Sequence, residues 1–273
     1  MAEVELKRED GIAYRETTAD GEAERTPVLL VHGFPETSYM WRDVMPAIGA
    51  SGRRAVALDL PGFGDSEPDL PGTWERQVEA VERFRAALGL ERVALVVHDW
   101  GGLIGLRWAC EHPEAIEALA ISDTGFFPDG KWNGIAETLR SEQGEEVASN
   151  LSRDLLAGAL RGLGRGFDDD VVDEYAKVLA TPERRQVALD LYRSGDFEKI
   201  EPYEETLRAF EVPVLALWGE GDELAPVAGA HRVKRELPQT EIVVVEGAGH
   251  FVYGDEPERC ARELVAFLGR LGK

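Results

Sequence analysis

The stretch that decides the fold is Val93-Ala-Leu-Val-Val-His-Asp-Trp-Gly-Gly102. Its apolar start predicts a buried parallel strand, and the apolar spacing from Leu103 to Ala109 predicts a helix. A strand that turns sharply into a helix is the geometry of a nucleophile elbow, which lifts one side chain beside the free N–H groups of the helix N-terminus. The lifted residue is Asp99. A carboxylate needs no proton removed before it attacks, so Asp99 suits displacement at an sp³ carbon through a covalent ester.

Composition limits the class of protein. The chain has 273 residues, 44% of them hydrophobic, which suits one large α/β domain with an insertion. It has no apolar run of about 18 residues and no signal-peptide core near its start, so we expect no membrane span and no secretion signal. Cys110 and Cys260 lie in helical patterns and are expected to be free buried thiols. These features favour a cytoplasmic protein, and the net charge of −22 argues against nucleic acid and anionic membranes as partners.

Strand and helix patterns alternate along much of the chain. Helices are expected near Trp74–Leu88, between the last two strands, and from about Pro257 to Leu271. Such alternation predicts an α/β fold with a mostly parallel sheet flanked by helices. Besides Val93–Val97, the expected strands are Val4–Leu6, Ile12–Arg15, Val28–Val31, Ala55–Leu58, Ile116–Ile121, Val214–Trp218 and Ile242–Val245.

One interval interrupts the alternation. From residue 125 to 212 the chain carries helical patterns and no convincing strand, which predicts a helical cap inserted into a core of residues 1–124 and 213–273. The expected cap helices are Ile135–Leu139, Val147–Leu160, Val171–Leu179 and Arg184–Leu191.

Two further polar side chains follow strands and join Asp99 at the expected active edge. Asp222 follows the strand ending at Trp218, and His250 follows the one ending at Val245 within a glycine-rich loop. Active sites of such sheets lie at the carboxyl ends of the strands. The chain order of nucleophile, acid and histidine is that of the α/β-hydrolase triad. His32 is expected to anchor the neighbouring loop by hydrogen bonds.

The whole chain resembles the α/β-hydrolase superfamily, from the first strand to the last helix. Within that superfamily, three motifs resemble the haloalkane dehalogenases and the epoxide hydrolases, whose nucleophile is an aspartate. The motifs are His32-Gly-Phe-Pro35, His98-Asp-Trp-Gly-Gly102 and Gly249-His-Phe251. The resemblance implies that Asp99 attacks carbon and that His250, oriented by Asp222, activates the water that hydrolyses the ester. It implies an oxyanion hole formed by the backbone N–H groups of Phe34 and Trp100.

The acid has a second candidate. Asp123 follows the strand that ends at Ile121, and some dehalogenases use an acid at that position. The Gly-x-Gly-Asp turn favours Asp222, and Asp123 is then expected to cap the exit of the chain into the cap.

The resemblance does not decide whether the leaving group is a halide or an epoxide oxygen. A halide needs N–H donors, whereas an epoxide oxygen needs a proton donor such as a phenol. Trp100 and the cap residue Trp132 resemble the halide-binding pair of one dehalogenase branch, while Tyr192 lies where epoxide hydrolases carry one ring-opening tyrosine. We therefore expect a haloalkane dehalogenase first, with an epoxide hydrolase as the alternative and a non-catalytic ligand-binding protein of the same fold as a third reading.

The expected substrate is a small apolar organic molecule, with water as co-substrate. No metal or other cofactor is expected, because no spacing of His, Cys, Asp and Glu suggests a metal site and no phosphate loop is present. The protein is expected to be a monomer or homodimer.

Overall fold

A single eight-stranded sheet forms the centre of the molecule in the computed structural model, which describes residues 3–19 and 25–271. The strand order is β1-β2-β4-β3-β5-β6-β7-β8. The strands are β1 (Val4–Glu9), β2 (Ile12–Thr17), β3 (Val28–Val31), β4 (Ala55–Leu58), β5 (Val93–His98), β6 (Ile116–Ser122), β7 (Val214–Gly219) and β8 (Glu241–Val245).

The sheet is parallel except at one edge. β1 pairs antiparallel with β2, and β2 pairs antiparallel with β4, while every later pairing is parallel. Every residue of β3, β4, β5 and β7 is buried. Burial on both faces explains why these strands are continuous apolar runs and not alternating ones. The expected α/β architecture is confirmed.

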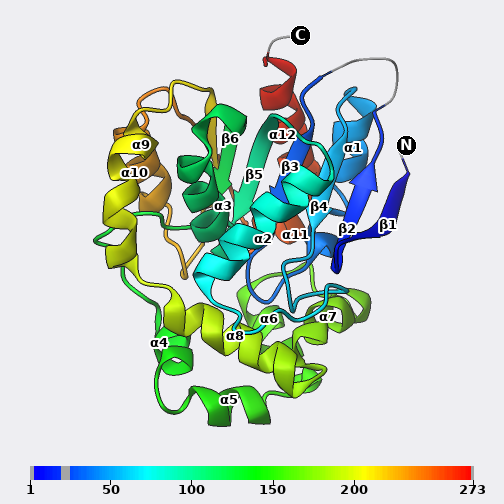
Figure 1. The fold of residues 1–273 in the computed structure, drawn as a ribbon, viewed down its shortest axis with the longest axis vertical. Helices are drawn as coiled ribbons and strands as arrows, with labels where there is room; N and C mark the ends of the chain where they lie inside the picture. Colours follow the sequence, from blue (N-terminus) through cyan, green and yellow to red (C-terminus); the bar gives the residue numbers. More distant parts are fainter. Residues whose placement is uncertain (1–2, 20–24, 272–273) are drawn as a thin grey trace.

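Helices that follow the strands cover the sheet. In Figure 1, α2 and α3 cross in front of it and pack against each other, and α1 packs against α12. α2 begins where the Thr73 hydroxyl accepts the N–H of Arg76, a standard N-terminal cap. The core helices are α1 (Met45–Ala50), α2 (Trp74–Ala87), α3 (Trp100–Glu111), α10 (Ala228–Glu236), α11 (Val252–Asp255) and α12 (Pro257–Gly269), with 3-10 turns η1 (Ser38–Trp41) and η2 (Pro113–Ala115).

The segment between β6 and β7 is helical wherever it has regular structure. α4 to α8 gather at one end of the molecule, beyond the edge where β5 meets α3 (Figure 1). η4 and α9 instead pack against α3 beside the sheet, so the helical layer at that end is formed by α4–α8. The elements are α4 (Gly134–Arg140), α5 (Gly144–Asn150), α6 (Arg153–Leu163), α7 (Asp169–Tyr175), η3 (Ala176–Leu179), α8 (Pro182–Ser194), η4 (Phe197–Tyr203) and α9 (Glu204–Arg208).

One expected helix is wrong in its extent. The pattern Val147–Leu160 is two helices, because α5 ends at Asn150 and α6 begins at Arg153. The Ser152 hydroxyl accepts the N–H of Leu155 and caps the second helix. A serine within a helical pattern of apolar residues marks the start of a new helix when its hydroxyl accepts a backbone N–H three residues later.

The two cysteines are free and buried, as expected. Burial raises the pKa of the Cys110 thiol to about 12, so this thiol stays protonated. Among the described residues, no helix is both long and apolar enough to cross a bilayer.

Candidate active site

The elbow lies at the end of β5. Asp99 connects β5 to α3 with φ of 48°, in the left-handed region that a non-glycine residue rarely adopts. The glycines after it permit the close packing, since a Cβ on Gly101 would lie 2.2 Å from the Val31 carbonyl oxygen. The Thr124 hydroxyl donates to the Asp99 carbonyl oxygen at 2.6 Å, and this hydrogen bond stabilises the backbone of the turn. The sharp strand-to-helix turn therefore presents the Asp99 side chain at the carboxyl edge of the sheet.

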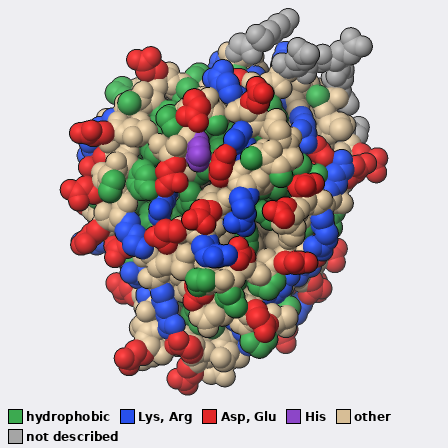
Figure 2. Space-filling model, viewed as in Figure 1, with side chains coloured by type: hydrophobic (Ala, Val, Ile, Leu, Met, Phe, Trp, Pro, Cys, Tyr) green, Lys and Arg blue, Asp and Glu red, His purple; other side chains and the backbone are tan. Residues whose placement is uncertain are grey.

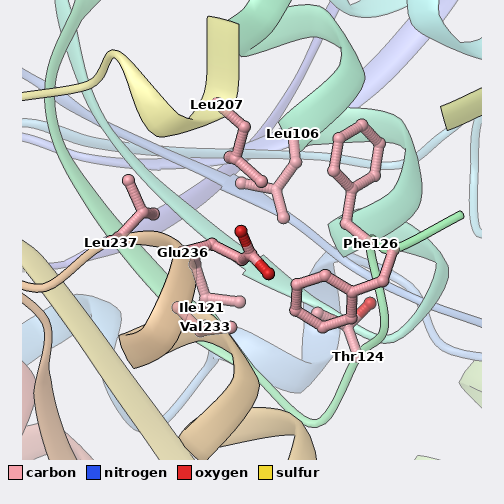
Figure 3. A pocket seen from close by; sticks show the side chains of 9 residues that line it. Leu106, Ile121, Thr124, Phe126, Leu207, Val233, Glu236 and Leu237 are labelled. Atoms are coloured by element: carbon pink, nitrogen blue, oxygen red, sulfur yellow. The ribbon is translucent and has the colours of Figure 1, made fainter. Parts of the chain in front are cut away.

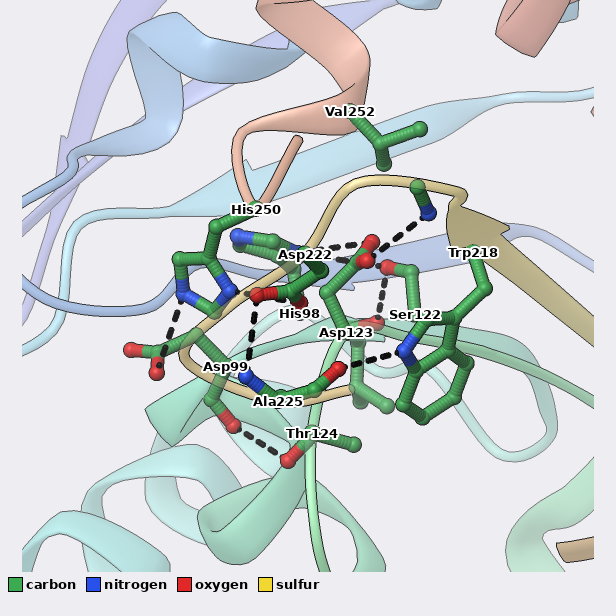
Figure 4. A network of polar contacts seen from close by, with 12 residues as sticks. His98, Asp99, Ser122, Asp123, Thr124, Trp218, Asp222, Ala225, His250 and Val252 are labelled. Carbon is green, nitrogen blue, oxygen red and sulfur yellow. Dashed lines mark hydrogen bonds and ion pairs between the residues drawn. The ribbon is translucent and has the colours of Figure 1, made fainter. Parts of the chain in front are cut away.

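Three predicted side chains meet at this edge (Figure 4). His250 Nε2 lies 3.5 Å from Asp99 Oδ2, and His250 Nδ1 lies 2.9 Å from Asp222 Oδ2. The Asp222 side chain is fully buried, whereas that of Asp99 is 25% exposed. The histidine thus bridges an accessible carboxylate and a buried one, which is the arrangement of a nucleophile, a base and an orienting acid.

Backbone donors hold the buried acid. Asp222 Oδ1 accepts the N–H groups of Leu224 and Ala225 at 2.8 and 2.9 Å, which leaves Oδ2 for the histidine. Burial opposes its charge, but the contact to His250 and these N–H groups lower the pKa of Asp222 below its usual value. Asp222 is therefore an anion at neutral pH.

The charge on His250 follows from its two neighbours. Burial alone would lower its pKa, but the contacts to Asp222 and Asp99 outweigh burial and raise the pKa of His250 well above 6.5. The pKa of Asp99 is lowered: burial opposes its charge, and His250 and the Phe34 N–H more than compensate. The resting site therefore holds an ionised Asp99 beside an imidazolium.

The backbone N–H groups of Phe34 and Trp100, the expected oxyanion-hole donors, both lie beside Asp99. The Phe34 N–H donates to Asp99 Oδ1 at 2.8 Å. Trp100 is the first residue of α3, so its N–H lies at the helix N-terminus, where backbone donors have no intrahelical partner. The loop is anchored as expected, because the Leu60 N–H donates to His32 Nε2 at 2.9 Å and His32 Nδ1 lies 2.7 Å from the Gly33 oxygen.

Asp123 lies beneath the triad and caps no helix. Its side chain is fully buried, and Oδ1 accepts the Gly219 N–H at 2.9 Å. Oδ2 lies 3.8 Å from His98 Nδ1 (Figure 4). Burial and the Asp222 charge raise the pKa of Asp123 well above its usual value. The structure thus joins His250 to Asp222, whereas Asp123 is a buried carboxyl group whose charged form is disfavoured.

Two buried side chains behind the site were not singled out from the sequence. Glu36 is 2% exposed, and its Oε2 lies 3.3 Å from His98 Nε2. Burial and the Asp99 charge raise the pKa of Glu36 to about 8, and burial lowers the pKa of His98 to about 3. Both groups are therefore mainly neutral at pH 7. Their one sequence signal is position, because Glu36 follows the His-Gly-Phe-Pro motif and His98 precedes the nucleophile.

A cavity of about 380 Å³ opens above Asp99. Its floor is Asp99, His250 and Phe34, and its walls come mainly from residues on or next to α4, α5, α6 and α8. Beyond the catalytic pair, its polar side chains are Asn133, Thr138 and Tyr192, and no lysine or arginine belongs to its lining. The lining comprises Phe34, Pro35, Asp99, Asn133, Gly134, Ile135, Thr138, Leu139, Val147, Leu151, Leu156, Ala159, Leu160, Leu163, Tyr192, Leu224, His250 and Phe251.

Tyr192 and Trp132 occupy different places around this cavity. The Tyr192 ring lines it and makes edge contacts with Phe34 and Trp100, both at 5.1 Å between centroids. The Trp132 ring stacks on the Trp100 ring at 5.3 Å between centroids, and neither indole is part of the lining. Burial and the Asp99 charge raise the pKa of Tyr192 well above 10, so the group presented beside Asp99 is a neutral phenol that can donate a proton.

A second hollow is too small for a substrate. It measures about 10 Å³ and lies among Leu106, Ile121 and Val233, away from Asp99 (Figure 3). A space of this size holds at most one water molecule. The cavity above Asp99 is the candidate substrate site because Asp99 and His250 belong to its lining.

The comparisons with known proteins match this geometry. The model of the alpha/beta hydrolase fold family matches residues 26–257. The chain belongs to the alpha/beta hydrolase fold family. As a member of this family it carries an aspartate at the elbow, and its overall resemblance to haloalkane dehalogenases is confirmed by its relatives.

Two of these relatives are similar to this family member over most of their length. A haloalkane dehalogenase of Sphingobium indicum is 30% identical and covers 90% of this chain and 89% of its own. One of Psychrobacter cryohalolentis is 28% identical, with 91% and 85% covered. A solved haloalkane dehalogenase of Bradyrhizobium elkani superposes with a TM-score of 0.85 over 99% of both chains at 23% identity, which supports the fold.

Proposed function

We propose that this protein is a haloalkane dehalogenase, which converts a haloalkane and water into an alcohol, a halide ion and a proton. One observation carries the proposal: the ionised carboxylate of Asp99 stands at the elbow, with His250 and Asp222 behind it and an apolar cavity in front. A carboxylate nucleophile suits attack at carbon, and an apolar lining suits an uncharged halogenated substrate. The relatives named haloalkane dehalogenases support the same assignment.

In the first step, an oxygen of Asp99 attacks the carbon that bears the halogen. The carbon–halogen bond breaks with its electron pair, so a halide ion leaves and an alkyl ester of Asp99 remains. The mainly apolar walls favour this step because they offer the carboxylate little solvation that would weaken it as a nucleophile.

Once Asp99 is an ester, His250 has lost the anionic partner that stabilised its imidazolium, and it gives a proton to solvent. In the second step, the neutral His250 takes a proton from water, and the hydroxide attacks the carbonyl carbon of the ester. The Phe34 N–H and the N-terminus of α3 face the oxygen that becomes negative. The intermediate releases the alkoxide, which receives the proton from His250, and the regenerated Asp99 passes its own proton to His250, which restores the resting carboxylate and imidazolium.

The geometry favours Trp100 and Tyr192 as the groups that bind the leaving halide. Tyr192 lines the cavity, and its ring touches that of Trp100. Trp132, which the sequence favoured as the second donor, supports Trp100 by stacking. A phenol O–H and an indole N–H are both donors that can hold an anion.

A substrate assay tests the proposal. Incubation with 1-bromobutane or 1,2-dibromoethane is expected to release bromide and alcohol, measured by ion chromatography and gas chromatography. Asp99→Asn is expected to release no bromide, and this control separates catalysis from spontaneous hydrolysis. Wild-type protein that leaves every haloalkane intact would refute the assignment. Turnover of any substrate would also exclude a protein that merely binds ligands.

Epoxide hydrolysis is the second candidate, because a neutral phenol lines the cavity beside the nucleophile. Tyr192 could protonate the alkoxide that an opened epoxide ring leaves. Conversion of styrene oxide to its diol, with haloalkanes untouched, would favour this activity.

Two matched variants assign the second donor. Removal of the Tyr192 hydroxyl in Tyr192→Phe is expected to slow formation of the Asp99 ester by about ten- to a hundredfold, the range for one lost hydrogen bond to a charged group. Trp132→Phe is expected to have a smaller effect. The opposite ranking would return the halide site to the tryptophan pair.

The proposal extends to the setting of the reaction. We propose that the substrate is an uncharged small organic molecule, that water is the co-substrate, and that no metal or cofactor takes part. We also propose a cytoplasmic protein, monomeric or homodimeric, with residues 125–212 as the cap.

A further inference from the structure

Arg140 is the last residue of α4 and bridges two elements of the cap. Its Nη1 donates to the carbonyl oxygens of Tyr192 and Gly195, at the C-terminal end of α8. Its guanidinium carbon also lies 4.8 Å from the centroid of the Trp132 ring. In the part of the chain that the structure describes, the recorded partners of Arg140 are thus two carbonyl oxygens and an aromatic face.

The end of α8 is a favourable place for this cation. The last carbonyl groups of a helix lack intrahelical partners and carry the negative end of the helix dipole. A planar guanidinium can bond carbonyl oxygens while its face stacks on an indole, a combination that lysine cannot reproduce. Arg140 is therefore held both by its charge and by the shape of its guanidinium, which bonds the carbonyl groups and stacks on the indole.

All three groups held by Arg140 contact Trp100. The Tyr192 ring touches the Trp100 ring, and Trp132 stacks on it. Gly195 abuts the same ring so closely that a Cβ added to it would lie 2.4 Å from Trp100 Cη2. One guanidinium thus fixes the residues that surround the indole next to the nucleophile.

We propose that Arg140 is a positioning residue for the leaving-group site. It keeps the Tyr192 phenol and the Trp100 indole oriented towards the leaving group that forms at Asp99. It also joins these two side chains to α4, whose residues Ile135, Thr138 and Leu139 line the cavity. This inference rests on the proposed function, in which Trp100 and Tyr192 receive the leaving group. It assigns Arg140 to formation of the ester and not to hydrolysis, because His250 and Asp222 are held by other elements.

The test compares Arg140→Gln and Arg140→Lys with Arg193→Gln. Arg193 is the matched control, because it also joins α8 to neighbouring cap residues through the Ser141 carbonyl and Glu145, but it contacts none of the groups around Trp100. Rapid-quench mass spectrometry measures formation and decay of the Asp99 ester separately, and the melting temperature is recorded for each variant.

Arg140→Gln is expected to slow ester formation about tenfold, the effect of losing a charge-assisted hydrogen bond that holds the donors, while ester decay stays within twofold of wild type. The affinity for iodide, read from quenching of tryptophan fluorescence, is expected to fall with it. Arg140→Lys is expected to recover part of both losses, and Arg193→Gln to leave both unchanged.

Equal slowing of both steps in Arg140→Gln, or an equal effect of Arg193→Gln, would overturn the inference and make Arg140 a general structural residue. The same comparison can use an epoxide if the wild type opens epoxides instead. A wild type that forms no ester with either substrate class would refute the proposed function, whereas a wild type that forms the ester without a selective effect of Arg140 would refute this inference alone.

Discussion

At the level of single residues, the two acids near His250 differ in charge because they differ in partners. Asp222 has two backbone N–H donors and the imidazole, whereas Asp123 has one N–H donor and lies beside the charged Asp222. The pKa is lowered for the first and raised for the second. Asp222 can therefore stabilise an imidazolium, because it contacts His250 directly, whereas the recorded partners of Asp123 are Gly219 and His98.

This difference predicts the effects of two isosteric variants. Asp222→Asn removes the charge that stabilises His250 and its tautomer, so turnover is expected to fall by about 10⁴-fold, as in other triads. Asp123→Asn keeps the shape of a side chain whose charged form burial already disfavours, and it is expected to reduce turnover less than about tenfold, the effect of one altered hydrogen bond. Steady-state rates on a common substrate give both values. The reverse ranking would make Asp123 the acid.

The charge of His250 should change during the cycle. In the free enzyme the contacts to Asp222 and Asp99 outweigh burial and raise its pKa well above 6.5. Once Asp99 is an ester, its negative charge is gone, so the pKa of His250 should fall and the neutral base should form. Decay of the ester is therefore expected to speed up with rising pH and to level off at a pH below the NMR titration midpoint of His250 in the free enzyme. Coincident midpoints would contradict this account.

The sequence predicted the triad because each member follows a strand and stands in a recognisable turn. It could not decide between Tyr192 and Trp132 as the second donor, since that choice depends on which ring reaches the cavity and on the stacking of two indoles. It also missed Glu36 and Arg140, because no local pattern shows that a glutamate is buried or that an arginine reaches the end of another helix.

At the level of elements, the close packing of the loop after β3 against the elbow sets the position of the nucleophile. A Cβ on Gly33 would lie 2.4 Å from Asp99 Oδ1 and 2.5 Å from its Cβ. Gly33→Ala is therefore expected to displace the carboxylate and to reduce turnover by about a hundredfold, the cost of a misplacement near 1 Å. Ester formation in a single turnover measures the effect.

Gly158→Ala is the matched control. Gly158 lies inside α6, and a Cβ added there meets no atom within 4 Å. The substitution is expected to leave turnover unchanged and to stabilise the protein by about 0.5–1 kcal/mol through the higher helix propensity of alanine. Full activity of Gly33→Ala would show that the elbow tolerates movement and would contradict the close packing.

The strands were easier to predict than the cap helices, for a physical reason. A buried parallel strand is a short apolar run between turn residues, and β5 reads that way from Val93 onward. Cap helices have one apolar side towards a cavity, so their ends depend on capping bonds such as that of Ser152. The sequence pattern alone does not distinguish a capping serine from a serine inside a helix, so it predicts one helix over Val147–Leu160 where the structure has two.

At the level of the whole molecule, α8 is fixed to the core along its length and so holds Tyr192 at a set distance from Asp99. Hydrogen bonds join α8 to the segment between β4 and the start of α2. Arg140, at the end of α4, in turn bonds the C-terminal end of α8 at Tyr192 and Gly195. The bonds run from Arg184 to the carbonyls of Gly62, Gly64 and Ser66, from the Gly72 N–H to Asp190, and from the Trp74 N–H to Ser194.

The surface charge is the other property of the whole molecule. The chain has 52 acidic and 30 basic side chains, and Figure 2 shows acidic groups across the visible face with basic groups among them. Repulsion within this net charge of −22 should destabilise the folded state at low ionic strength. The melting temperature is expected to rise between about 0.02 and about 0.5 M potassium acetate, because salt screens exposed charges. Acetate is used as the anion because a halide could bind the active site and stabilise the protein.

A constant or falling melting temperature would contradict this prediction. It would show that the acidic side chains are already neutralised by nearby basic ones.

The central claim is that Asp99 forms a covalent ester with the substrate and that water attacks the ester, not the substrate. A single turnover in ¹⁸O-labelled water, with enzyme in excess over 1-bromobutane, tests it most directly. Because water attacks the carbonyl carbon of the ester, ¹⁸O is expected in the carboxylate of Asp99, located by mass spectrometry of the peptide that contains it, and the alcohol from this first turnover is expected to be unlabelled. Label in the first alcohol with none in Asp99 would mean that water attacks the substrate carbon directly, and it would contradict the account.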